Sequence, residues 1–308
     1  MPKSDARIVV DRATLLDLKN KAKRLTLYAK FKPDGIFSGQ NSSKFRGQGL
    51  SFEELRTYRT GDNIKDIDWK ASMRANGRVT KVFTQETDRP ALVLCDQRAN
   101  MFFGSQRYMK SVVAAQLATL IAWLLHLQGD RVGGITIGAN QTLVQYPSRT
   151  TSQILRYISD ITTLNQALRN SPKEKAPVFV PLQETLTTYT PLLGSSGTLV
   201  LVIDGLALTN QELDQLKRLS IKHNVMVFLI TDLLEQDYES ASDLLISDGS
   251  KQIKLDNNAQ DILRYQTASN EHFAKVRRSV HHAGLPFGLF NTVDEPYLQL
   301  SQLLREGG

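Results

Sequence analysis

The chain has 308 residues, of which 41% are hydrophobic and 22% are charged, a composition typical of a folded globular protein. This composition excludes a disordered chain, a collagen-like chain and a coiled coil, and the length predicts about two folded units. The one cysteine, Cys95, excludes an internal disulfide and a cysteine-rich zinc site, so we expect a reducing, cytoplasmic location.

The formal net charge of +7 is concentrated near the N-terminus. Residues 1–90 carry 19 basic and 11 acidic side chains, a net charge of +8, whereas residues 91–308 carry 19 and 20, a net charge of −1. Such asymmetry is typical of chains that bind nucleic acid, an anionic membrane or an acidic protein. The cations that would form such a face are Lys19, Lys21, Lys23, Arg24, Lys30 and Lys32.

Residues 1–90 are expected to form a smaller, basic N-terminal portion of the protein. Its first element is an amphipathic helix, because Leu15, Leu18, Ala22 and Leu25 recur at helical spacing. A loop rich in Gly, Ser and Asn follows, and the alternating pattern of residues 79–86 predicts a strand.

In residues 91–308, short apolar runs of strand length alternate with helical patterns. Strands are predicted at 91–96, 131–138, 142–147, 198–204, 225–232 and 286–292. Helices are predicted at 151–164, 182–193, 211–223, 260–284 and 296–306. A short strand pair is predicted at 243–249 and 252–256. This alternation predicts an α/β fold with a doubly wound, mostly parallel sheet.

One uncharged run, residues 111–129, approaches the length that is needed to span a bilayer. A predicted strand precedes the run and another follows it. A buried crossover helix of a parallel sheet explains this arrangement, and we therefore expect no transmembrane segment.

Three of the predicted strands end in an acid: Asp96, Asp204 and Asp232. Ligands of doubly wound sheets bind outside the carboxyl ends of the strands, and magnesium needs only one or two carboxylates plus water. The alternative interpretation is that these acids cap helices or form turns.

Motifs of catalysis are absent from the sequence. It has no phosphate-binding Gly-Lys-Ser/Thr loop, no dinucleotide-binding glycine pattern, no nucleophile elbow and no metal-binding histidine pattern. Cys95 lies inside an apolar strand and is expected to be inert core. We therefore assign no catalytic residue and predict that the protein is not an enzyme.

A long, gap-free set of motifs extends from residue 45 to residue 96. A Gly-rich turn precedes Phe-Glu-x-x-Arg-x-Tyr-x-x-Gly-Asp, and Ile-Asp-Trp, an Arg and a Glu follow; the residues are Phe52, Glu53, Arg56, Tyr58, Gly61, Asp62, Ile67, Asp68, Trp69, Arg74 and Glu86. This pattern closely resembles the bacterial family known as domain of unknown function 58, and the resemblance covers nearly the whole chain.

The resemblance implies a von Willebrand factor A-like domain in residues 91–308. It also implies a partnership with MoxR-type AAA+ ATPases and with other von Willebrand A proteins, so we expect a non-enzymatic protein-interaction adaptor in complex assembly or chaperone-like activity. The alternative is binding to nucleic acid or to an anionic membrane surface, as a peripheral protein, through the basic N-terminal region. Nucleic acid is disfavoured because no helix-turn-helix, RNA-recognition or OB-fold signature is present.

Von Willebrand A domains bind magnesium through Asp-x-Ser-x-Ser, a distant Thr and a later Asp. In this chain the first motif reads Asp96, Arg98 and Asn100, the threonine position falls on Val180 or Pro181, and Asp204 matches the last acid. The resemblance thus implies a degenerate metal-ion-dependent adhesion site in which Arg98 pairs with Asp96 or Asp204. We expect no cofactor and no tightly bound magnesium, although Asp96 and Asp204 are the metal candidates, and we expect these residues to form the rim that a partner contacts.

The N-terminal motif has two interpretations that the sequence leaves open. In the structural one, Gly61 and Asp62 form a turn, Trp69 anchors a core, and Arg56 and Arg74 pair with acids such as Asp62 and Asp68. In the other, these residues contact a ligand or a partner.

Overall fold

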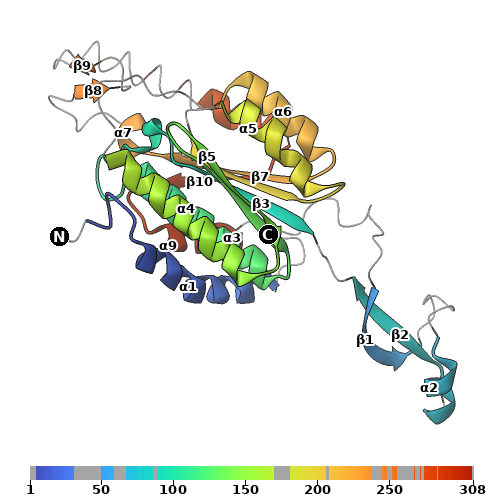
Figure 1. Ribbon diagram of the computed structural model, residues 1–308. Coiled ribbons are helices and arrows are strands. Elements are labelled where there is room, and N and C mark those ends of the chain that lie inside the picture. Colours follow the sequence, from blue (N-terminus) through green and yellow to red (C-terminus); the bar gives the residue numbers. More distant parts are fainter. Residues whose placement is uncertain are drawn as a thin grey trace. The chain divides into compact units, whose positions relative to one another are not determined.

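The computed structural model describes the residues 5–30, 50–58, 67–75, 77–85, 89–169, 181–205, 208–236, 245–247, 252–254, 267, 271, 274–282 and 284–306. The chain divides into two compact units (Figure 1). The larger comprises Met1–Gln40 and Arg89–Gly308, and the smaller comprises Asn41–Asp88.

The larger unit is built on a six-stranded sheet with the order β10-β7-β6-β3-β4-β5. Its strands are β3 (Pro90–Asp96), β4 (Arg131–Ile137), β5 (Thr142–Ser148), β6 (Thr198–Asp204), β7 (Asn224–Thr231) and β10 (Phe287–Asn291). All neighbours pair in parallel except β5, which is antiparallel to β4. The predicted α/β fold with a mostly parallel sheet is therefore confirmed.

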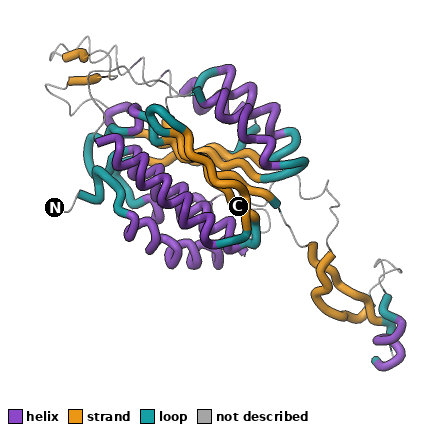
Figure 2. The backbone as a smooth tube through the Cα atoms, in the orientation of Figure 1, coloured by secondary structure: helices purple, strands orange, loops and turns teal. Residues whose placement is uncertain are grey.

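Helices cover both faces of this sheet (Figures 1 and 2). One face packs against α3 (Lys110–Leu127), α4 (Thr151–Arg169) and α9 (Pro296–Glu306), and the other against α5 (Leu182–Tyr189), α6 (Asn210–Ser220) and the helical residues 274–282. The central strands β3 and β6 are almost entirely apolar because alternate side chains enter opposite cores: Val93 of β3 lies in the first and Leu94 in the second. Shorter elements are η2 (Ala99–Met101), η3 (Thr190–Leu193), α7 (Leu233–Gln236), β8 (Leu245–Ser247) and β9 (Gln252–Lys254).

Helix α3 contains most of the long uncharged run whose length approaches that of a transmembrane helix. It is long and apolar enough to cross a membrane, yet 89% of its apolar window is buried inside the fold. One side of the helix contacts the sheet, and the helix α1 (Arg12–Lys30) covers it from outside. A helix that is apolar all round fits a position that is covered on both sides, so the predicted buried crossover helix is confirmed.

Helix α1 belongs to the larger unit, whereas the sequence analysis placed it in a separate portion of residues 1–90. Its apolar residues Leu15, Leu18, Ala22 and Leu25 are buried in the same core as α3. An amphipathic pattern shows that a helix has a buried face but does not show which surface covers that face, and this explains the difference.

The smaller unit contains the hairpin of β1 (Leu50–Thr57) and β2 (Val79–Gln85), with the short helix α2 (Trp69–Arg74) between them in sequence. The predicted strand at 79–86 is confirmed. Asp68 caps α2, since its Oδ1 accepts a hydrogen bond of 3.0 Å from the backbone N–H of Ala71.

In the structural interpretation of the N-terminal motif, Trp69 anchors a core, and the smaller unit contradicts this part of that interpretation. Trp69 is 61% exposed and Met73 is 77% exposed, and none of the residues of α2 is buried. Of the other motif residues, Gly61, Asp62 and Glu86 and the side chains of Phe52 and Glu53 lie outside what the structure describes.

We predict that the substitution Leu15→Ala destabilises the larger unit by about 2–5 kcal/mol, because it leaves a cavity between α1 and α3. Urea denaturation measures the change, and Thr14→Ala, at the neighbouring exposed position of the same helix, is the control. Equal unfolding midpoints for the two variants would contradict the position of α1 in this core.

Candidate functional site

The candidate site lies at the carboxyl edge of the sheet. Asp96 ends β3 and Asp204 ends the neighbouring strand β6. From β3 the chain continues to β4 and β5 on one side, and β6 leads to β7 and β10 on the other. These two strand ends therefore flank the point at which the strand order reverses, which is the usual ligand position of doubly wound sheets.

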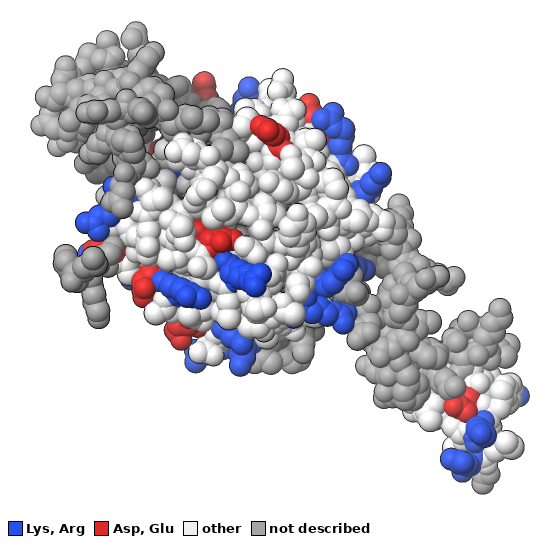
Figure 3. Space-filling model, viewed as in Figure 1, with Lys and Arg blue, Asp and Glu red and all other residues white. Residues whose placement is uncertain are grey.

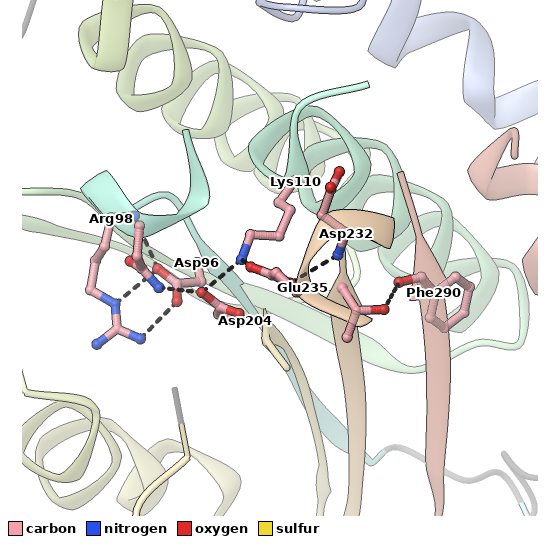
Figure 4. A network of polar contacts seen from close by, with 9 residues as sticks. Asp96, Arg98, Lys110, Asp204, Asp232, Glu235 and Phe290 are labelled. Atoms are coloured by element: carbon pink, nitrogen blue, oxygen red, sulfur yellow. Dashed lines mark hydrogen bonds and ion pairs between the residues drawn. The ribbon is translucent and has the colours of Figure 1, made fainter. Parts of the chain in front are cut away.

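Arg98 and Asp96 form a buried ion pair (Figure 4). The Arg98 Nε lies 2.9 Å from Oδ1 of Asp96 and its Nη2 lies 2.7 Å from Oδ2, while the backbone N–H of Arg98 donates to Oδ1 at 3.0 Å. Burial lowers the pKa of Arg98, but the attraction and hydrogen bonds of Asp96, together with the charges of Glu212 and Asp204, outweigh burial and raise that pKa above its ordinary value. The expected pairing of Arg98 is present, and it engages both oxygens of Asp96.

Asp204 is engaged by a residue that the sequence analysis missed, Lys110. The Lys110 Nζ lies 3.0 Å from Oδ2 of Asp204 and also donates to Oε1 of Glu235 in α7. The side-chain amide of Asn100 donates to the same Oδ2 at 2.8 Å. The strand-end acids are thus brought together with cations and an amide from the segment that connects β3 to α3.

A signal for Lys110 was present in the sequence. It is the last charged residue before the uncharged run that became α3, and it is the first residue of that helix. A cation is disfavoured at a helix N-terminus by the helix dipole, so a lysine there needs nearby carboxylates. Because Glu235 is 125 positions away in the chain, its contact with Lys110 could not be read from spacing.

Burial and neighbouring charges shift the pKa values of Lys110 and Glu235 in opposite directions. Burial lowers the pKa of Lys110, but the attraction of Asp204 and Glu235 raises it above its ordinary value, so the ammonium is charged at neutral pH. Burial raises the pKa of Glu235, and the opposing attraction of Lys110 does not cancel the rise. Lys110 is 2% exposed and Asp204 is 4% exposed, so water screens this pair little.

Asp232 extends the cluster toward the next strands. Its Oδ2 accepts hydrogen bonds from Thr292 Oγ1 and from the backbone N–H of Ser105, and its Oδ1 accepts from the N–H of Leu234. Its own N–H donates to Oε2 of Glu235 at 2.9 Å. Asp232 therefore acts as a turn and helix-start residue, which is the second of the two interpretations of the strand-end acids.

The residues of this edge do not fit a magnesium site of the von Willebrand A type. Arg98 engages both oxygens of Asp96, and Lys110 and Asn100 share one oxygen of Asp204. Pro181, which precedes α5, has no hydroxyl to offer, and Val180 lies outside the described residues. Within the described part of the chain, no group of three or more His, Cys, Asp or Glu residues is placed to hold a metal ion.

The surface at this edge comes from the segment between β3 and α3. Of the four predicted rim residues, Asp96, Arg98 and Asp204 are buried and Asn100 is exposed. Phe103, which is 36% exposed, is also at the surface. We call the segment between β3 and α3 the edge loop. Its exposed residues are Ala99, Asn100, Phe103, Gln106 and Arg107.

Two of the basic side chains of α1 contact other residues of the larger unit. The Lys19 Nζ lies 4.8 Å from the ring centroid of Trp123, and Lys21 is paired with Glu295, while Lys23 and Arg24 are exposed. The side chain of Lys30 and the whole of Lys32 lie outside the described residues. On the visible face of the larger unit, basic side chains alternate with acidic ones and form no single patch (Figure 3).

One protein family matches most of the chain. The family described as "Protein of unknown function DUF58" matches residues 54–275. The chain belongs to this family. The match includes Arg56, Tyr58, Asp68, Trp69 and Arg74 of the N-terminal motif and both strand-end acids, Asp96 and Asp204.

Two relatives of this DUF58 protein are mycobacterial proteins. Uncharacterized protein Mb1516 of Mycobacterium bovis and uncharacterized protein Rv1480 of Mycobacterium tuberculosis are each 22% identical to the chain over 264 residues. The aligned region covers 85% of this chain and 81% of each relative.

We predict that Arg98→Met lowers the free energy of unfolding by about 3–5 kcal/mol, because it leaves the carboxylate of Asp96 buried without its cation. Adding Asp96→Asn should recover part of the loss, so that the double variant is more stable than the sum of the single changes predicts. Urea denaturation of the four proteins gives this coupling.

The chain contains a matched control for this experiment. Arg7 contacts Asp5 with the same backbone and guanidinium donors, but at the surface. Arg7→Met should leave stability almost unchanged, since water screens an exposed pair. Equal effects of Arg7→Met and Arg98→Met would show that the buried pair has no special part in the stability of this edge.

Proposed function

We propose that the protein is a non-enzymatic adaptor whose larger unit, a von Willebrand factor A-like domain, binds a protein partner at the carboxyl edge of its sheet. The observation that carries the proposal is that the charged side chains at this edge are buried and paired with one another. They form a fixed base, and the edge loop with Asn100, Phe103 and Arg107 is what a partner meets.

The arrangement of the sheet supports the von Willebrand A-like assignment. Asp96 and Asp204 stand at the two strand ends where that type of domain carries its metal-binding acids, and they flank the reversal of strand order. The two serine positions of that motif carry Arg98 and Asn100 here, so a guanidinium group binds Asp96 and an amide group binds Asp204.

The state of the ionisable groups supports a binding role over catalysis. A general base must reach the proton that it abstracts, and Asp96 and Asp204 are buried beneath Arg98, Lys110 and Asn100. Burial raises the pKa of the Cys95 thiol to about 12, which removes a nucleophilic thiolate at neutral pH. We propose no cofactor for this chain.

The partner that we propose is a MoxR-type AAA+ ATPase, or another von Willebrand A protein, in the cytoplasm. The family resemblance supplies this partner class, and the edge loop supplies the surface. Aromatic and arginine side chains are enriched among the residues that anchor protein interfaces, and the edge loop exposes one of each, Phe103 and Arg107.

We predict that the chain, immobilised on a resin, captures the MoxR-type ATPase of its own host in at least one nucleotide state. The double variant Phe103→Ala/Arg107→Glu should weaken capture by about tenfold or more, because it removes both anchors and replaces none of the four residues of the buried ion pairs, Asp96, Arg98, Lys110 and Asp204. Titration of the ATPase in the apo, ADP-bound and ATP-analogue-bound states gives the affinities.

The control variant for this experiment is Ile221→Ala. Ile221 is 73% exposed, and it lies between α6 and the first residue of β7, at the opposite edge of the sheet. The variant Ile221→Ala should leave capture of the ATPase unchanged. A failure to capture the ATPase in every nucleotide state, or equal loss in both variants, would count against the proposed partner or the proposed surface.

A second candidate function is peripheral binding to an anionic membrane through the smaller unit. Trp69 and Met73 are four residues apart on α2, so they lie on one face of the helix, and both are exposed. Lys70 and Arg74 of the same helix are exposed as well. Exposed apolar side chains beside basic ones suit the interface of an anionic bilayer.

We predict for this second function that the chain sediments with vesicles of phosphatidylglycerol and phosphatidylcholine, and that its tryptophan emission shifts to the blue. Trp69 is the reporter because Trp123, the other tryptophan, is 1% exposed. The variant Met73→Ser/Arg74→Gln should reduce binding, whereas Lys23→Gln/Arg24→Gln on α1 is the control. Equal binding to neutral vesicles, or binding to DNA alone, would reject the membrane role.

A further inference from the structure

Lys110 connects two elements that carry acids at the carboxyl edge. Its Nζ contacts Asp204 at the end of β6 and Glu235 in α7, and Lys110 itself begins α3 (Figure 4). Three separate elements therefore meet at one ammonium group. A divalent cation at this edge would have the same task, since it too would hold carboxylates from different elements together.

We propose that the Lys110 ammonium is a tethered replacement for a divalent metal ion, and that its removal opens a metal site formed by Asp204, Glu235 and Asn100.

The charges of the cluster support the first half of this proposal. Asp96 is neutralised by Arg98, and Lys110 is the cation that both Asp204 and Glu235 contact. Two carboxylates that share a buried place repel each other unless a positive charge lies between them. The ammonium of Lys110 therefore does what a metal does for paired acids, and it is covalently part of the chain.

The fixed position of Lys110 also supports its role as a replacement for a metal ion. Its backbone N–H donates to the carbonyl of Phe103 at 2.7 Å, and its Nζ lies 5.7 Å from the centroid of the Phe103 ring. Phe103 thus holds the backbone of Lys110 by a hydrogen bond and contacts its ammonium through the ring. The ammonium cannot leave the site as a weakly bound metal ion can, so the edge keeps its arrangement at any concentration of divalent cation.

The donor atoms around Lys110 support the claim that its removal opens a metal site. Asp204 and Glu235 provide carboxylate oxygens, and the amide of Asn100, which contacts Asp204, also carries a carbonyl oxygen. Carboxylate and amide oxygens are the ligands of magnesium and manganese, and water completes the coordination sphere. In Lys110→Ala the loss of the long side chain leaves room for the ion and its waters.

The test compares the thermal unfolding of the wild type, Lys110→Ala and the control Lys21→Ala, each in EDTA and in millimolar Mn²⁺. Lys21 is a matched control because it is also a lysine paired with a glutamate, but at a partly exposed position. In EDTA, we expect the midpoint of Lys110→Ala to fall by about 10 °C, and that of Lys21→Ala by a few degrees at most.

Mn²⁺ should restore at least half of the loss in Lys110→Ala and should not change the other two proteins. Titration calorimetry should then detect one Mn²⁺ site in Lys110→Ala, which Lys110→Ala/Glu235→Gln lacks. Binding of Mn²⁺ to the wild type at the same affinity, or no response of Lys110→Ala to Mn²⁺, would overturn the proposal.

A variant that fails to fold still gives an answer. If Lys110→Ala does not fold in EDTA, it is refolded in Mn²⁺, and recovery of the native fold supports the proposal. If it folds in neither condition while Lys110→Met/Glu235→Gln folds in both, the ammonium acts only as a counter-ion and the latent metal site is rejected. None of these measurements involves a partner, so their outcome is independent of the proposed adaptor role.

Discussion

The carboxyl edge of the sheet depends on the neutralisation of buried acids by cations of the same chain. Asp96 and Asp204 end the two central strands, where polar groups would otherwise lie in an apolar and nearly dry environment. Arg98 and Lys110 supply the opposite charges from the segment that follows β3. The edge loop and α7 take their positions from these contacts, and so does the start of α3.

Helix α3 links this ionic cluster to the apolar core. Its first residue is Lys110, and most of the following residues are buried between the sheet and α1. A shift of the helix would therefore break contacts of both kinds. The ion pairs fix the position of the helix along its axis, and the packing on two sides fixes its rotation. This double constraint explains how a loop at the surface can have a rigid base.

The sequence predicted the fold more completely than the site. Continuous apolar runs such as 198–204 predicted the central strands, because burial on both faces of a parallel sheet requires such runs. The pairing of Arg98 with Asp96 was also within reach, since only one residue separates them in the chain. Lys110 was missed because both of its partners are distant in sequence. The exposure of Trp69 was missed because hydrophobicity predicts burial only where another element covers the residue.

The covering of α3 by α1 makes the larger unit discontinuous in sequence, with the smaller unit inserted between its two segments. A fragment that starts at β3 would lack α1 and would expose the outer side of a helix that is apolar all round. Such a fragment would aggregate or enter a detergent micelle, and it would be mistaken for a membrane protein. The larger unit therefore keeps its core only when α1 is present together with the residues from Arg89 onward.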